Sequence, residues 1–280
     1  MRALLIVLMT TFLWTLGGCG NDSKRWGELD GDSDGDGDGD GDSDGDGDGD
    51  GDGDSDGDGD GGQMGFSILK VTIRDFPKDH SDMEMLFPDS AGDDDGPELP
   101  TTGLVFDTLG SDKTPVFASS TGNDENKKGA IITDAKSFDD WYHTKDAVNK
   151  EFTKEIKLEE TSPGTFEYDN DMFFPLTNDE GFGAEGNPHN YYFTTEIHTG
   201  FTYSGGEVFT FIGDDDLWMF IDDKLIIDLG GLHLSSTKTV NLDELGLTKD
   251  QLYQMHIFHA ERKMKDSHFK ISTSIEFIIE

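Results

Sequence analysis

The sequence has few of the residues that build disulfide frameworks or bind nucleic acids. Its 280 residues include a single cysteine, Cys19, so no intramolecular disulfide can form. Lysine and arginine total 21 against 60 aspartate and glutamate residues, which gives a formal net charge of −39. Because such a surface repels polyanions and attracts cations, the charge excludes nucleic acid as a partner and favours a cation as a ligand.

The one long apolar run lies at the N-terminus, between Met1 and Trp14, and is too short to cross a bilayer. With one basic residue before it, the run is typical of a signal peptide. The next residues resemble the lipobox of bacterial lipoproteins, which implies a signal peptide over residues 1–18 and acylation of Cys19 in the sequence Leu16-Gly17-Gly18-Cys19. Acyl chains anchor a protein to a membrane, and Gly20 replaces the Asp that favours inner-membrane retention, so we expect a lipid anchor at the outer membrane or cell surface. An ordinary signal peptide with a chance cysteine is the alternative.

A low-complexity tract follows, in which every even-numbered residue from Asp30 to Asp60 is aspartate and the residues between are glycine or serine. The tract has no apolar surface to bury, so we expect residues 19–62 to form a disordered linker. Repulsion between charges about 7 Å apart extends such a chain, whose upper reach is about 100 Å. The repeat also resembles the start of an EF-hand calcium loop, but counting from Asp30 the twelfth position is Gly41, where an EF-hand requires glutamate. The tract is therefore interpreted as a spacer.

The remaining residues, 63–280, are long enough for one sizeable domain. Short alternating or apolar runs are separated by acidic turns, a pattern that predicts an all-β, antiparallel β-sandwich with long loops and one or two short helices. Helices are expected over residues 137–142 and 243–247, and long loops over residues 87–102 and 181–190. Strands are expected over residues 68–73, 191–203, 207–212, 217–222, 225–229, 251–260 and 268–279.

Three adjacent acids, Asp214, Asp215 and Asp216, lie between two of these expected strands. Neighbouring carboxylates repel one another and prefer water, so a packed core alone has no use for them. Calcium coordinates six to eight oxygen atoms and would neutralise the repulsion. The triplet therefore predicts a calcium site, with Asp228 at the end of a following strand as a further carboxylate ligand.

A series of ordered motifs runs through residues 66–280. The most specific are Gly213-Asp214-Asp215-Asp216-Leu217-Trp218, Asp228-Leu229-Gly230-Gly231-Leu232-His233 and Phe258-His259-Ala260-Glu261-Arg262. Together they resemble the fibro-slime family, which is related to the β-sandwich first described in anthrax protective antigen. In flocculin-type members of that wider group, two adjacent aspartates joined by a cis peptide hold a calcium ion that coordinates sugar hydroxyls. Carried over, the resemblance implies Asp214 and Asp215 as this pair, or Asp215 and Asp216 after a shift of one residue.

Other residues of these motifs have alternative interpretations. Trp218 offers an apolar ring to a bound sugar, or packs in the core, since it alternates with apolar neighbours. His233 and His259 are interpreted as structural, because calcium prefers oxygen to imidazole. Glu261 and Arg262 are expected to form ion pairs with neighbouring strands.

The expected function is that of a surface lipoprotein that displays a calcium-dependent carbohydrate-binding or adhesion module toward an extracellular polysaccharide or cell-surface glycan. A non-catalytic structural or matrix protein, in which calcium only stabilises the fold, shares these features and stays open. A glycan-degrading enzyme is the remote alternative, since paired carboxylates serve glycosidases. The sequence has no HExxH zinc motif and no serine–histidine–aspartate elbow, so an enzyme is not expected.

Overall fold

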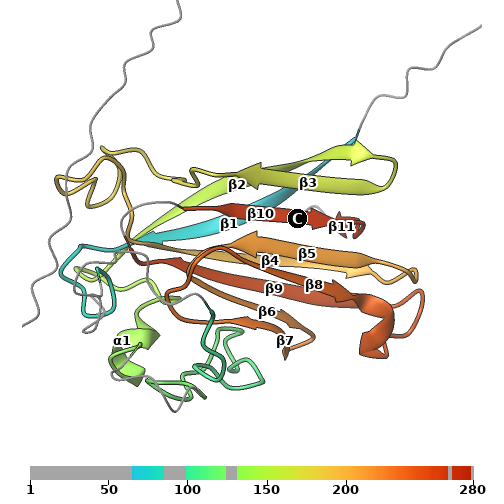
Figure 1. Cartoon of the computed structure of the whole chain (residues 1–280), viewed down its shortest axis with the longest axis horizontal. Helices are drawn as coiled ribbons and strands as arrows, with labels where there is room; N and C mark the ends of the chain where they lie inside the picture. The colour runs from blue at the N-terminus through green and yellow to red at the C-terminus, as the bar shows by residue number, and fades with distance from the viewer. Residues whose placement is uncertain (1–64, 85–98, 124–130, 264–266, 279–280) are drawn as a thin grey trace, which may run out of the picture. The chain divides into compact units, whose positions relative to one another are not determined.

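The computed structural model describes residues 65–84, 99–123, 131–263 and 267–278, all within one compact unit, Gly59–Glu280. The expected signal peptide, Cys19 and the spacer lie outside the described residues, so the lipid anchor stays a prediction. No helix in the described ranges is long and apolar enough to cross a membrane. The described fold is almost entirely β structure (Figure 1).

The described residues form one 11-stranded sheet in the order β7-β6-β9-β4-β1-β2-β3-β10-β5-β8, with β11 paired to β4. Every pairing between these strands is antiparallel. The strands are β1 (Phe66–Asp75), β2 (Lys150–Ser162), β3 (Thr165–Asn170), β4 (Phe193–Thr202), β5 (Val208–Gly213), β6 (Asp216–Ile221), β7 (Lys224–Leu229), β8 (Ser236–Asn241), β9 (Leu252–Glu261), β10 (Phe269–Thr273) and β11 (Phe277–Ile278).

The sheet folds over so that its two halves share one core. Alternation in β5 turns Phe209 and Phe211 inward, where they join Ile197 of β4 and Ile257 of β9 in a single buried cluster. Fully burying an aromatic or large aliphatic side chain contributes about 1.5–3 kcal/mol, so these inward faces supply much of the folding free energy. The predicted all-β antiparallel sandwich is confirmed.

The outer face of β6 and β9 is covered as well. All six residues of β6 are buried, because residues of the segments 99–123 and 131–149 pack a second apolar cluster on this face, around Trp218 and Phe258. In Figure 1 these two segments, the second of which contains helix α1 (Ala135–Asp139), lie beside β6 and β7. The sequence predicts the helix over residues 137–142, but it begins earlier, because Asp134 is the N-cap and Ser137 completes the capping box from inside the helix. The second predicted helix corresponds to the 3₁₀ turn η1 (Leu242–Leu245).

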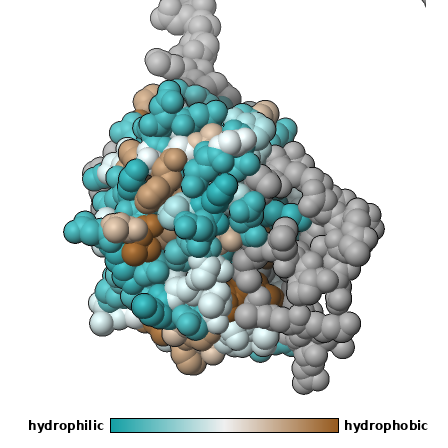
Figure 2. Space-filling view, turned by 90° about the vertical axis from the view of Figure 1, so that its left-hand side faces the viewer, coloured by the Kyte–Doolittle hydropathy of each residue, from teal (hydrophilic) through white to brown (hydrophobic). Residues whose placement is uncertain are grey.

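Three strands were not predicted: β2, β3 and β8. The residues of β2 that point away from the core are mostly lysine and glutamate, so its apolar signal comes from Phe152, Ile156 and Leu158 alone. The predicted strand over residues 268–279 is divided into β10 and β11 by residues 274–276, where the Ile275 N–H donates to the Thr273 side-chain oxygen at 3.0 Å. The face in Figure 2 is predominantly hydrophilic, with apolar residues interspersed, as is usual for a folded surface.

Candidate functional site

The acidic triplet forms the connection from β5 to β6, at one end of the sandwich. Gly213 precedes it, where an added Cβ would lie 2.6 Å from the His268 carbonyl oxygen, so only glycine fits beside β10. Asp215 then adopts a left-handed conformation with φ 61°, which aspartate tolerates better than most residues. The described residues contain no cis peptide bond, so the cis linkage that the resemblance implies is absent from this turn. The left-handed residue reverses the chain instead.

The three carboxylates point to different partners. Asp214 Oδ1 accepts a hydrogen bond from the His268 backbone N–H at 2.8 Å, and Asp215 Oδ2 accepts one from the Arg262 backbone N–H at 2.9 Å. Asp216 Oδ2 pairs with Arg262 Nε at 2.7 Å, and its Oδ1 accepts from the Gly231 N–H at 2.6 Å. Both oxygens of Asp216 are therefore engaged within the protein, while Asp214 and Asp215 are each held by a single backbone donor.

Alternation along the chain separates Asp216 from the other two acids. Asp216 is paired with Ala260, on the outer face that also carries Trp218 and Phe258. Asp215 precedes β6 in the left-handed turn, close to the last residue of β9, Glu261, and both side chains are buried. The structure thus brings Asp214 and Asp215 to Glu261, which the sequence analysis assigned to an ion pair.

Glu261 is the unexpected member of the site. Its side chain is 1% exposed, and Oε2 has no hydrogen-bond partner among the described residues. Burial, and then the carboxylates of Asp215 and Asp214, raise the pKa of Glu261 well above its usual range. Burial likewise raises the pKa of Asp215 to about 7 and raises the pKa of Asp214. Three carboxyl groups therefore lie close together in a poorly solvated place, where ionising all of them is unfavourable without a cation.

This donor set fits calcium. A bound cation offsets the repulsion between buried carboxylates, and calcium takes oxygen ligands only. The nearest guanidinium, that of Arg262, is engaged by Asp216 through Nε. His259 lies on the same strand, but burial lowers the pKa of its imidazole to about 3. Its ring packs near Phe173 and Phe269, which agrees with the structural role expected for this histidine.

Asp228 and Trp218 lie away from this group. Trp218 Nε1 donates to Asp228 Oδ1 at 3.0 Å, and the Gly103 N–H donates to Asp228 Oδ2 at 2.8 Å. Asp228 is paired with Trp218 in the sheet and so shares the outer face, which means that the structure does not bring it to Asp214 and Asp215. The Trp218 ring is fully buried against Phe138 and Trp141, as the core-packing interpretation requires, and is not presented to a ligand.

Two further histidines lie at this end of the sandwich. The ring nitrogens of His233 lie 2.7 Å from Leu234 O and 3.3 Å from Leu229 O, which agrees with the structural role expected for it. His268, whose backbone holds Asp214, has its side chain beside Asp169 and Asp171, and one ligand atom from each lies within 4.8 Å of the others. Asp169 and His268 are about a hundred residues apart, so no local sequence signal could have identified this group.

Part of this chain is similar to a described domain family and to several curated proteins. A model of the PA14 domain matches residues 144–277, which include β2 to β10 and the acidic turn. Among curated proteins, psiR of Dictyostelium discoideum is 39% identical over 189 residues, covering 62% of this chain and 18% of that protein. From the same organism, psiC is 38% identical over 189 residues, covering 64% and 36%, and psiN is 33% identical over 236 residues, covering 75% and 30%. The chain therefore spans about a third or less of the length of these relatives.

The matches to solved structures have low TM-scores. The PA14 sugar-binding domain from an RTX adhesin matches with a TM-score of 0.25 and 13% identity, covering 32% of this chain and 52% of that chain. The PA14 domain of the MpAFP antifreeze protein matches with a TM-score of 0.28 and 7% identity, covering 73% of this chain and 80% of that chain. The Epithelial Adhesin 9 A domain from Candida glabrata, solved with Galβ1-4GlcNAc, matches with a TM-score of 0.26 and 11% identity. The match covers 74% of this chain and 80% of that chain.

Proposed function

We propose that this chain is a non-catalytic carbohydrate-binding or adhesion module that depends on calcium. The observation that carries the proposal is the convergence of Asp214, Asp215 and the fully buried Glu261 at the turn between β5 and β6. The PA14 match over residues 144–277 supports the choice of a carbohydrate ligand, since the RTX adhesin with a matching domain is described as sugar-binding.

In this proposal some residues would hold the calcium ion and others would orient those ligands. Asp214, Asp215 and Glu261 would hold the ion, and calcium, when bound, coordinates hydroxyl groups of a sugar at its open positions. The ion pair of Asp216 and Arg262 fixes the backbone at the end of the turn, where β6 begins. The Arg262 backbone N–H orients Asp215, and the His268 backbone N–H orients Asp214. The ligand set therefore differs from the sequence prediction by exchanging Asp216 and Asp228 for Glu261.

Display at the cell surface is the second part of the proposal. Acylation of Cys19 would anchor the chain, and the aspartate-rich spacer would carry the module up to about 100 Å from the membrane. Mass spectrometry of the mature protein tests this part: an acylated N-terminal Cys19 supports it, and an unmodified one overturns it. Cys19→Ala is expected to release the protein from membranes.

A structural surface protein is the second candidate, and one observation favours it. Asp215 and Glu261 are 5% and 1% exposed, so an ion bound to them has fewer positions open to a sugar than one bound to exposed acids. Calcium would then stabilise the turn only, and the protein would contribute to a matrix through protein contacts. A glycan-degrading enzyme remains the remote third candidate.

Calorimetry with the full chain tests the calcium site. We expect calcium binding that is lost in Asp214→Asn/Asp215→Asn and retained in Asp222→Asn/Asp223→Asn. The control pair, at the β6–β7 turn, is likewise two adjacent acids, and both of its residues have positive φ, as Asp215 does. Asparagine tolerates the left-handed conformation, so both variants should fold. Absence of binding at millimolar calcium, or equal binding by both variants, would overturn the site.

A glycan array with and without chelator separates the candidate functions. Sugar binding that the chelator abolishes supports the proposal, whereas calcium binding without any sugar binding supports the structural protein. Sugar binding that ignores the chelator contradicts the calcium mechanism. Release of cleaved sugars on the same array would identify an enzyme.

A further inference from the structure

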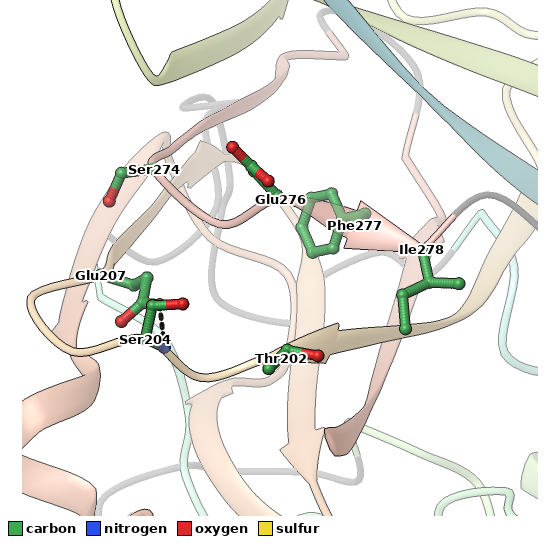
Figure 3. Close-up of a pocket in the computed structure, with 7 residues that line it drawn as sticks. All are labelled: Thr202, Ser204, Glu207, Ser274, Glu276, Phe277 and Ile278. Carbon is green, nitrogen blue, oxygen red and sulfur yellow. Dashed lines mark hydrogen bonds between the residues drawn. The ribbon is translucent and has the colours of Figure 1, made fainter. Parts of the chain in front are cut away.

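A cavity of about 380 Å³ lies at the opposite end of β5 from the acidic turn. β5 begins beside the cavity, at Val208, and ends at Gly213, so its six residues separate the two places by about 20 Å. Figure 3 shows the lining side chains around a common space: Thr202, Ser204, Glu207, Ser274, Glu276, Phe277 and Ile278. The volume is within the range of small-molecule sites.

The side chains that line the cavity include acidic groups and no basic groups. The lining contains two carboxylates and three hydroxyl groups, and no lysine, arginine or histidine. Glu207 is engaged in holding the turn, because its oxygens accept from the Ser204 and Gly205 backbone N–H groups at 2.5 and 2.8 Å. Glu276 is exposed and has no ion-pair or hydrogen-bond partner within the described part of the chain. The cavity therefore holds negative charge without a cation of its own.

Another acidic residue, Asp243, lies close to the part of the cavity that Ser204 and Glu207 line. Asp243 accepts hydrogen bonds from Tyr203 Oη at 2.6 Å and from the Gly206 backbone N–H at 2.7 Å, so it supports the same turn from outside the lining. Gly205 and Gly206 have φ 95° and 90°, and no atom lies near the position of an added Cβ, which leaves this side of the turn open. An approaching cation would meet an accessible and pre-shaped acidic wall.

We infer that this cavity binds a sugar residue that carries a free, protonated amino group. The ammonium would pair with the Glu276 carboxylate, and the hydroxyls of Thr202 and Ser204 would exchange hydrogen bonds with the ring hydroxyls. The Ser274 hydroxyl accepts from the Val208 backbone N–H at 3.0 Å, so it would act toward the sugar as a donor. The Phe277 ring supplies an apolar wall, as is common in small-molecule sites. The three hydroxyls favour a polyol over the bare alkyl ammonium of a lysine side chain. This site is independent of the proposed calcium site and can be tested separately.

Calorimetry of the full chain with glucosamine oligomers and with the matching N-acetylated oligomers, at about pH 6 where the amine is protonated, tests the inference. We expect the amine form to bind at least about ten-fold more tightly than the acetamide form, a difference of about 1.4 kcal/mol. Chelator should leave this preference unchanged, and added salt should weaken it.

Glu276→Gln should remove the preference, and Glu244→Gln should keep it. Glu244 is an exposed acid on η1 outside the lining, so its variant makes the same change in net charge. Because Glu276 is exposed and unpaired, its variant should fold like the parent. Equal binding of the two oligomers, no binding of the amine, or an unchanged preference in Glu276→Gln would each overturn the inference. Calcium binding that is lost in Glu276→Gln and retained in Asp214→Asn/Asp215→Asn would place a metal ion in the cavity and would overturn the inference too.

Discussion

Asp216 and Arg262 form an ion pair in which neither side chain exposes any surface, with Arg262 Nε 2.7 Å from Asp216 Oδ2. The pair joins the start of β6 to the residue after β9. The guanidinium also donates to Ile131 O at 2.8 Å and lies 4.7 Å from the centre of the Trp141 ring. It therefore ties the sheet to the segment that covers its outer face, beside the turn that carries Asp214 and Asp215.

Loss of one partner of this pair should destabilise the fold with or without calcium. Removing one member leaves an uncompensated buried charge, so we expect Asp216→Asn to lower the unfolding free energy by about 3–5 kcal/mol. The control is Glu159→Gln, which breaks an exposed pair with Lys157 and should cost less than about 1 kcal/mol. Denaturant unfolding in calcium and in chelator measures both. A loss confined to calcium would identify Asp216 as a metal ligand and contradict this role.

Glu261→Gln should raise the thermal stability of the protein in chelator and reduce the stabilisation that calcium gives. In chelator it removes a buried carboxyl group whose ionisation is opposed by burial and by Asp215 and Asp214, so the variant should unfold at a higher temperature than the parent. Calcium at 100 times its dissociation constant should stabilise the parent by about 2.7 kcal/mol, and the variant by clearly less. Thermal unfolding with Glu244→Gln as the control checks this. If calcium raised the unfolding temperature of parent and variant equally, Glu261 would be excluded from the calcium site.

Asp75 should make stability depend on pH. Burial raises its pKa to about 6, above 3.8 in the unfolded chain, so the folded state binds this proton more tightly. The cost of ionising it is fully present above about pH 6, declines as the pH falls, and is absent below 3.8. Asp75→Asn should therefore raise the unfolding free energy at about pH 8 by up to about 3 kcal/mol, and by much less at about pH 4. Denaturant unfolding at both values checks this, and an equal gain at both would contradict it.

Trp218→Phe should change stability and leave ligand binding intact. The variant loses the hydrogen bond to Asp228 and some packing against Phe138 and Trp141, at a cost of about 1–3 kcal/mol. Because the ring is fully buried, affinity for a glycan identified on the array should stay within about two-fold, measured by calorimetry below the unfolding transition. A large loss of affinity in a folded variant would instead place Trp218 at the ligand.

Local patterns predicted the parts of the fold whose signal is local. The apolar runs around the acidic turn predicted β5, β6 and β7, because a strand with buried faces needs such runs. The charged outer face of β2 concealed its apolar positions, and the helix start was misplaced because Ser137 and Asp134 are both capping residues by type. The choice between them depends on backbone geometry.

The sequence by itself determined that the chain is acidic, all-β and marked by three adjacent carboxylates. Only the tertiary structure decided which side chains each of these carboxylates contacts. Asp216 and Arg262 are 46 residues apart, and they are brought together because β6 pairs with β9 in the register that sets Asp216 opposite Ala260. Since side chains alternate between the faces of a strand, that register sends Asp216 outward with Ala260, whereas Glu261, the next residue of β9, faces the inner side and lies close to Asp215.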